Sequence, residues 1–236
     1  MEAKDKILVA LDVDNSESAY QLVKDLAPYV GGFKIGLELI MAIGAKAAIE
    51  IVHSYCADVF LDGKFCDISN TVGKASNVIS DLGVKMFNVH ASAGVEAMRA
   101  AVANKRGSLV LAVTVLTSLD QYDAQLIFGS SAEAKVLQFA RDAKLAGCDG
   151  IVCSPQELMM LGKNKELSGL LKVVPGIRPK GSSKNDQERF MTPGQAIEAG
   201  ADYLVIGRPI TGDKSPVEAA KRIADEIQEE LEVIKE

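Results

Sequence analysis

The sequence DVFLDGKF at residues 58–65 combines an apolar run with charged residues at its end. Val59 and Phe60 favour a β-strand, because β-branched and aromatic side chains pack well on a pleated surface. Asp62 and Lys64 differ from them, since charged side chains are costly to bury unless they are paired. We therefore expect a strand that is buried along most of its length and carries polar chemistry near its C-terminal end.

Seven other apolar runs alternate along the chain with segments of helical periodicity. Together with the first they predict eight strands, at residues 7–13, 31–36, 58–65, 84–90, 108–116, 150–154, 171–176 and 202–207. The helices are expected at residues 16–29, 37–53, 70–82, 92–104, 132–146, 155–163, 193–199 and 215–234. Strands this rich in Val, Ile and Leu are typical of parallel sheets that are covered on both faces.

Eight strand–helix alternations predict an α/β protein, a closed parallel (β/α)8 TIM barrel that occupies residues 1–236 as one domain. The alternative is an open doubly wound sheet, but no glycine-rich dinucleotide motif follows the first strand. We expect Ser16 to cap the first helix and Gly44 to interrupt the second. Segments 119–131 and 177–192 exceed the usual loop length, and such loops are often lids.

The composition is that of an ordinary globular protein, with 48% apolar and 25% charged residues. No run approaches the roughly 20 apolar residues that a membrane-spanning helix needs. The N-terminal sequence shows no secretory signal, so we expect a cytoplasmic protein with no membrane partner. A net charge of −6 argues against nonspecific nucleic-acid binding, which needs a basic surface.

Cysteine and histidine are too scarce to support several kinds of site. The four cysteines lack CxxC spacing, which favours reduced thiols over a disulfide or metal framework. A zinc site or a Ser-His-Asp triad would have to use His53 or His90, the only histidines. We therefore expect no metal and no triad.

Polar residues recur where the predicted strands end, which is where barrels of this kind place their active sites. They are Asp12, Lys34, Asp62, Lys64, His90, Thr117, Gly176, Arg178, Gly207 and Arg208. Asp62 and Lys64 are two residues apart, so a regular strand would direct both to the same face, beside Lys34 of the neighbouring strand. This spacing predicts a Lys–Asp–Lys array facing the barrel mouth; the alternative is a purely structural ion-pair network.

The pair Gly207-Arg208 after the eighth strand suits a phosphate group. Glycine allows close backbone approach, arginine forms paired hydrogen bonds with phosphate, and barrels often hold phosphate at strands seven and eight. Arg178 and Gln187 on the long segment are expected to close over the same anion; the alternative is a turn with solvated side chains. His90 is left out of the catalytic set, because a hydrogen-bonded polar residue at a strand end is an equally good interpretation.

The segment 62–71, DGKFCDISNT, resembles the Asp-x-Lys-x-x-Asp-Ile-Pro-Asn-Thr signature of the orotidine 5′-phosphate decarboxylase family. The stretches ALDVD, FKIG, VTVLTS, PGIRP, DQERFMTP and VIGRPIT occur in the family's order as well, so the resemblance covers nearly the whole chain. Ser69 stands where proline is usual, and Cys66 where histidine is common in bacterial members. Neither position is one that the family uses for chemistry.

This resemblance implies a cofactor-independent decarboxylation of orotidine 5′-monophosphate to uridine 5′-monophosphate, the last step of de novo pyrimidine biosynthesis. It implies a catalytic set of Lys34, Asp62, Lys64 and Asp67, with Lys64 protonating C6 and Asp62 beside the departing carboxylate. It implies that Asp12 and Lys34 hold the ribose, and that Thr117 contacts the pyrimidine. It also implies a phosphate site made by Arg178, Gln187, Gly207 and Arg208. Finally, it implies a homodimer in which Asp67 and Thr71 reach the partner's site.

Two other functions remain as alternatives. One is a magnesium-dependent enzyme of the same superfamily, such as 3-keto-L-gulonate 6-phosphate decarboxylase or hexulose phosphate synthase. Those enzymes resemble the chain in Asp-x-Lys-x-x-Asp, but they carry a metal-binding glutamate about where Lys34 stands. The other is a non-catalytic phosphate-binding barrel, which would need Arg208 but not the three charged residues of the array.

Overall fold

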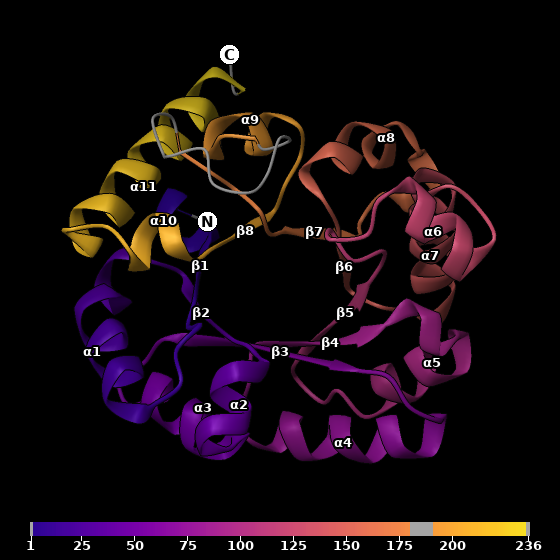
Figure 1. The fold of residues 1–236 in the computed structure, drawn as a ribbon, viewed down its shortest axis with the longest axis horizontal. Helices are drawn as coiled ribbons and strands as arrows, with labels where there is room; N and C mark the ends of the chain where they lie inside the picture. The colour runs from indigo at the N-terminus through magenta and orange to yellow at the C-terminus, as the bar shows by residue number, and fades with distance from the viewer. Residues whose placement is uncertain (1, 180–190, 235–236) are drawn as a thin grey trace.

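The computed structural model describes residues 2–179 and 191–234. In this part of the chain eight parallel strands form one sheet, and β8 pairs with β1 to close it into a barrel (Figure 1). The strands are β1 (Ile7–Ala10), β2 (Gly32–Ile35), β3 (Asp58–Phe65), β4 (Met86–His90), β5 (Leu109–Val113), β6 (Gly150–Val152), β7 (Leu171–Val174) and β8 (Tyr203–Ile206). The closed parallel barrel predicted from the sequence is therefore confirmed.

Helices surround the barrel as an outer ring (Figure 1). They are α1 (Ser16–Leu26), α2 (Leu37–Ile43), α3 (Ala45–His53), α4 (Ser69–Asp81), α5 (Val95–Ala103), α6 (Gln121–Phe128), α7 (Ala132–Ala146), α8 (Leu158–Lys163), α9 (Pro193–Glu198), α10 (Arg208–Thr211) and α11 (Pro216–Val233). The predicted interruption at Gly44 is confirmed, since this residue has φ +83° and separates α2 from α3. The N-cap prediction was wrong by one residue, because the Asn15 side chain accepts the hydrogen bond from the Ser18 backbone N–H.

Two apolar layers hold the barrel together. Alternate strand residues point inward and fill the barrel with side chains. This inner layer contains Leu8, Ala10, Phe60, Met86, Leu111, Val173, Tyr203 and Val205. The outward-facing residues form a larger core between the sheet and the helices. The filled interior leaves the two ends of the barrel as the places where polar chemistry can be exposed.

Residues 119–131 are not the irregular loop that the sequence suggested, because they contain α6. The Asp120 side chain caps this helix by accepting a hydrogen bond from the Asp123 backbone, and Gly129 ends it with φ +70°. Of its residues only Ala124 is buried, whereas Leu126 and Ile127 are exposed. An apolar face turned to solvent does not produce the usual amphipathic pattern, which is why the helix was missed.

Most predicted strands were too long at their C-terminal ends. Strand β1 ends at Ala10 and not at residue 13, and β5 ends at Val113 and not at residue 116. The chain leaves the sheet there and enters the loops that surround the barrel mouth. Among the described residues, no helix is long and apolar enough to cross a bilayer.

Candidate active site

A cavity of about 600 Å³ opens at the C-terminal ends of the strands. Most of the polar residues singled out from the sequence line it: Asp12, Lys34, Asp62, Lys64, Thr117, Gly176, Arg178, Gly207 and Arg208. Its floor is made by barrel-interior side chains, including Ala10, Phe60 and Val205. The fold thus gathers residues from β1, β2, β3, β5, β7 and β8 around one space.

Four charged groups alternate in sign across one side of this cavity. Lys34 Nζ lies 3.0 Å from Asp12 Oδ1 and 3.5 Å from Asp62 Oδ2. Lys64 Nζ lies 2.7 Å from Asp62 Oδ1. The side chains of Lys34 and Asp62 are only 12% and 13% exposed, so the pair between them is shielded from solvent, whereas Lys64 is 30% and Asp12 58% exposed. The expected Lys–Asp–Lys arrangement is therefore present, and Asp12 extends it by one charge.

Asp62 stays ionised at neutral pH in this setting. Its burial alone would raise the pKa of the carboxyl group, but the ammonium groups of Lys34 and Lys64 and hydrogen bonds from Lys64 and Asn88 outweigh that effect. The net result is a pKa below the ordinary value for aspartate.

The backbone around Lys64 is irregular, so the contact between Lys64 and Asp62 does not come from regular strand geometry. We expected a regular strand to place Asp62 and Lys64 on one face, but the β3–β4 register shifts between Leu61 and Phe65. Lys64 itself has φ +47°, in the left-handed region that residues other than glycine rarely adopt. The two side chains meet because of this irregularity and not because of simple alternation.

Sequence reasoning missed one residue of this region, Asn88. It is 1% exposed, and its amide contacts both Asp62 and Lys64. The available signal was a lone amide after the apolar residues Met86 and Phe87 of the strand MFNVH, two residues before His90. His90 is half-buried and makes no side-chain hydrogen bond to the described residues; its burial, followed by the charge of Lys64, lowers the pKa of its imidazole.

Two arginines, Arg178 and Arg208, also line the cavity. Arg208 is exposed and begins α10 directly after Gly207, whereas Arg178 is half-buried and its backbone N–H donates to the Met191 carbonyl at 3.1 Å. This bond joins the two described ends of the long segment after β7. Gln187, which the sequence placed at the same anion site, lies outside the described residues. Thr117 is exposed at the rim, after β5.

Asp67 and Thr71 lie apart from this group. Among residues 2–179 and 191–234, neither contributes to the lining of the cavity, and Asp67 forms no ion pair. The Asp67 carboxylate instead accepts a hydrogen bond from the backbone N–H of Ile68 at 2.7 Å. All residues from 66 to 71 are exposed, and Ile68 is 72% exposed although it is apolar. In one chain these two residues are therefore not assembled with the rest of the predicted site.

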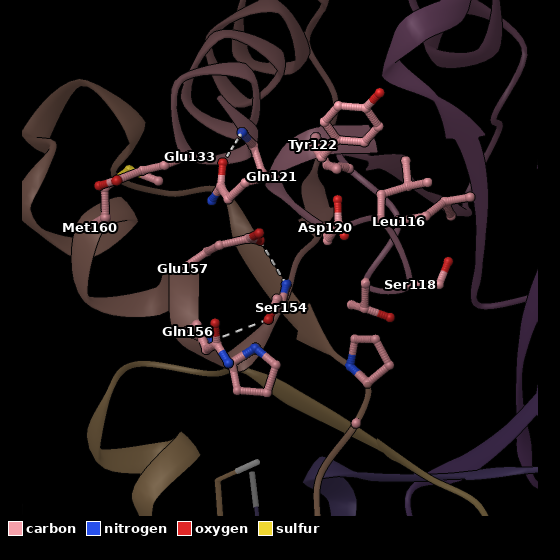
Figure 2. Close-up of a pocket in the computed structure, with 17 residues that line it drawn as sticks. Leu116, Ser118, Asp120, Gln121, Tyr122, Glu133, Ser154, Gln156, Glu157 and Met160 are labelled. Carbon is pink, nitrogen blue, oxygen red and sulfur yellow. Dashed lines mark hydrogen bonds between the residues drawn. The ribbon is translucent and has the colours of Figure 1, made fainter. Parts of the chain in front are cut away.

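A second pocket of about 880 Å³, lined in part by Gln121 and Tyr122 of α6, adjoins the first (Figure 2). The two pockets share Val115, Leu116, Thr117, Pro175 and Gly176. Glu157 lies in it, and its carboxylate accepts a hydrogen bond from the Ser154 backbone at 2.8 Å. Burial raises the pKa of Glu157 to about 7. Because Asp120 and Glu133 also line this pocket and no described lysine or arginine does, it does not suit an anion. An anionic ligand belongs on the side of Arg178 and Arg208.

Metal ligands are not grouped in the described ranges, where no cluster of three or more His, Cys, Asp or Glu residues could hold an ion. Two carboxylates of the cavity, Asp12 and Asp62, are bridged by the ammonium group of Lys34. A divalent cation between them would face that positive charge directly. The arrangement is suited to electrostatic chemistry by fixed side chains.

Gly36 provides the space that the Lys34 ammonium occupies. A Cβ atom at this position would lie 2.7 Å from Lys34 Nζ and 3.4 Å from Asp12 Oδ1, although the backbone, with φ −92°, accepts alanine. We predict that Gly36→Ala folds normally but displaces Lys34 and lowers kcat/KM roughly 100-fold, since small misplacements at a reacting centre have effects of that order. The measurement is steady-state kinetics together with thermal unfolding.

A matched control for this substitution is Gly162→Ala. Gly162 lies in α8, where an added Cβ would meet nothing within 4 Å. Its kcat/KM should equal that of the unmodified enzyme. If Gly36→Ala and Gly162→Ala had the same kcat/KM, the space beside Lys34 would not be needed for activity.

Comparison with known proteins was consistent across sequence and structure. Residues 5–223 match the family model described as Orotidine 5′-phosphate decarboxylase / HUMPS family. The orotidine 5′-phosphate decarboxylase of Heliobacterium modesticaldum is 46% identical, over 98% of this chain and 99% of that protein. The corresponding protein of Syntrophomonas wolfei is 45% identical, over 97% of this chain and 100% of its own length.

Solved structures give the same result for the fold. The crystal structure of orotidine 5′-phosphate decarboxylase from Lactobacillus acidophilus superposes with a TM-score of 0.81 at 32% identity, and covers 94% of this chain and 98% of that one. The enzyme from Pyrococcus horikoshii, at 24% identity and a TM-score of 0.78, shares the fold. The similarity thus extends over nearly the whole length of every chain compared.

Proposed function

This chain belongs to the orotidine 5′-phosphate decarboxylase / HUMPS family, and from that premise we propose that it converts orotidine 5′-monophosphate to uridine 5′-monophosphate without a cofactor. This reaction would be the last step of de novo pyrimidine biosynthesis. The observation that carries the proposal is the Lys34–Asp62–Lys64 array, which shares a cavity with Arg208. The names of the relatives that match over the full chain length support the same reaction.

Lys64 is the proposed proton donor. When the bond between C6 and the carboxyl group breaks, carbon dioxide leaves and the electron pair stays on C6 of the pyrimidine. The Lys64 ammonium group stabilises this negative charge and then transfers a proton to C6, and water restores the lysine proton. An ammonium that is already fixed by Asp62 at 2.7 Å needs little reorganisation during the reaction, which is how preorganised charges lower a barrier.

The remaining members of the array hold Lys64 and the substrate. Asp62 would lie beside the departing carboxylate, and its ion pairs hold both lysines in place, Lys34 at 3.5 Å and Lys64 at 2.7 Å. Asp12 and Lys34 would bind the ribose hydroxyls, as a carboxylate and an ammonium group 3.0 Å apart at the cavity wall. Neither role requires a metal ion or an organic cofactor.

The substrate's phosphate would bind to Arg178 and Arg208, with Gly207 allowing close backbone approach and Gln187 completing the site. Both arginines line the same cavity as the array, so one nucleotide can contact both ends. Arginine suits phosphate because its planar guanidinium forms paired hydrogen bonds. Thr117, at the rim, would contact the pyrimidine edge. Phosphate contacts far from C6 can then supply the binding energy for closing the site.

We also propose that the enzyme is a homodimer with shared active sites. In a single chain Asp67 and Thr71 lie outside the cavity, on an exposed segment that also presents the apolar side chain of Ile68. Burying that segment against a second copy would remove Ile68 from water. It would also carry Asp67 and Thr71 to the partner's cavity, with Asp67 as the fourth charged residue of the catalytic set.

The alternative within the family is a magnesium-dependent enzyme that acts on sugar phosphates. Lys34 argues against it, because its ammonium group lies between the two carboxylates that would have to bind the metal. A non-catalytic phosphate-binding barrel is a second alternative, but it would have no use for a charge array in the same cavity as the arginines.

We predict that the purified enzyme consumes orotidine 5′-monophosphate at the same rate with and without an excess of EDTA. The reason is that fixed ammonium groups, rather than a metal ion, neutralise the charge that develops on C6. The measurement is the loss of ultraviolet absorbance of the substrate after dialysis against the chelator. Activity that disappears with EDTA and returns with Mg²⁺ would favour the sugar-phosphate class, and tight nucleotide binding without turnover would favour the non-catalytic barrel.

A further inference from the structure

Asn88 of β4 lies opposite the point where the regular pairing of β4 with β3 is interrupted. Leu61 pairs with Phe87 and Phe65 pairs with Val89, so that residues 62–64 of β3 lie opposite the single residue 88. Such a bulge breaks the backbone ladder and leaves amide groups without their usual strand partners. Any group buried here needs a substitute hydrogen bond.

The Asn88 side chain provides such hydrogen bonds with both its amide oxygen and its amide nitrogen. Its Oδ1 accepts a hydrogen bond from the Lys64 backbone N–H at 2.7 Å, and its Nδ2 donates to Asp62 Oδ1, also at 2.7 Å. It is 1% exposed, so water does not compete for either bond. One amide thus holds the backbone of one residue of the array and the carboxylate of another.

The contact with Lys64 has an energetic consequence. Lys64 has φ +47°, a conformation that costs a residue with a Cβ atom roughly 1–2 kcal/mol. Strained backbone persists only where surrounding contacts fix it, and such strain is often found at functional sites. The hydrogen bond from the Lys64 N–H to Asn88 is a contact of this kind, made inside the barrel.

The contact with Asp62 fixes the plane of its carboxylate. Oδ1 accepts from both Asn88 Nδ2 and Lys64 Nζ, which leaves Oδ2 turned toward Lys34 at 3.5 Å. Turning the carboxylate out of this plane would weaken all three contacts together. Asn88 therefore helps to fix the plane in which the carboxylate presents its oxygens to the two lysines.

We propose that Asn88 is a positioning residue that preorganises the array, holding Lys64 in its left-handed conformation and Asp62 in its rotational setting before substrate arrives. This inference rests on the proposed function, since it assigns Asn88 to the decarboxylation that Lys64 performs. Asn88 does not line the cavity among the described residues, so it acts on the substrate only through Asp62 and Lys64.

Asn88→Leu tests this role, because leucine has a similar branched shape but offers no hydrogen bond. Its kcat should fall roughly 100-fold, the effect expected of a displaced catalytic group, while KM and the Kd for uridine 5′-monophosphate change less than threefold. Ser108→Ala is the matched control. It removes a buried hydrogen bond, from Ser108 Oγ to the Val84 carbonyl at 2.7 Å, between the N-terminal ends of β4 and β5, and should leave kcat unchanged.

Asn88→Asp separates the two halves of the amide. It keeps an acceptor for the Lys64 N–H but places a second carboxylate against Asp62, which Lys34, Lys64 and the nearby His90 also face. Two adjacent carboxylates share a proton, so the pKa of the pair rises. The acidic limb of the kcat/KM profile should therefore move to higher pH, and it should move further than in Asn88→Leu, which only removes one of the hydrogen bonds that lower the pKa of Asp62.

These measurements distinguish the inference from the proposed function. Failure of the unmodified enzyme to decarboxylate orotidine 5′-monophosphate would reject the function, whereas normal turnover by Asn88→Leu would reject the inference alone. An equal loss of kcat and of nucleotide affinity would also reject it, because that pattern indicates general damage to the fold. A crystal structure of Asn88→Leu provides a test independent of activity: unchanged conformations of Lys64 and Asp62 would overturn the inference.

Discussion

Replacing Lys64 with alanine is expected to lower kcat by about 10⁴-fold or more, because it removes the proton donor and the charge beside C6 together. The fold should survive, since Asp62 keeps Lys34 at 3.5 Å and Asn88 at 2.7 Å as partners. Binding of uridine 5′-monophosphate should survive as well, because the substitution leaves Arg178 and Arg208 in the cavity to bind the phosphate. Single-turnover kinetics and calorimetric titration with the product measure the two quantities separately.

Lys85→Ala is a closely matched control for this experiment. Lys85 is 32% exposed against 30% for Lys64, and it also pairs with an aspartate of β3, Asp58. That pair lies at the N-terminal end of the strand, away from the cavity. Its loss should therefore leave kcat unchanged. Turnover near the normal level in Lys64→Ala, or an equal loss in Lys85→Ala, would contradict the assignment of Lys64 as the proton donor.

The fold could be predicted from the sequence because local pattern and tertiary environment agree along most of the chain. The strand at 58–65 and the helix at 132–146 were predicted with the bounds that the structure gives. The helix is bounded by clear signals: the Ser131 side chain caps α7 by accepting a hydrogen bond from the Ala134 backbone N–H, and Gly147 ends it with φ +82°. Where the buried face was small, as in α6, no periodicity marked the helix.

The sequence predicted which types of residue line the cavity at the barrel mouth, but it did not predict how their side chains are arranged. Charged residues inside apolar strands indicated the array, because burial of such groups requires partners. The bulge at 62–64, the left-handed Lys64 and the role of Asn88 depend on how β3 meets β4, and no spacing within a single strand encodes that. Residues that act through a neighbouring strand are recognised only when both strands are seen together.

Mixing two inactive variants is expected to restore activity if Asp67 serves the partner's site. In a mixed dimer of Lys64→Ala and Asp67→Asn chains, one cavity lacks both groups, and the other has an intact Lys64 and receives an intact Asp67. With random exchange half of the dimers are mixed and each has one working site, so specific activity should recover to about a quarter of normal for a twofold-symmetric dimer. The measurement is turnover against time after mixing, with exchange followed by mass spectrometry of differently tagged chains.

The outcome depends on which chain's Asp67 completes the site. If Asp67 acted on Lys64 of its own chain, every chain in the mixture would lack one of the two groups, and no activity would appear even after complete exchange. The double variant Lys64→Ala/Asp67→Asn, mixed with Lys64→Ala, should remain inactive, because no chain in it retains Lys64. The exposed residues 66–71 lie outside the cavity of their own chain, and Asp67 has no ion-pair partner among the described residues. Recovery of activity would give this exposed carboxylate a function in the partner's site.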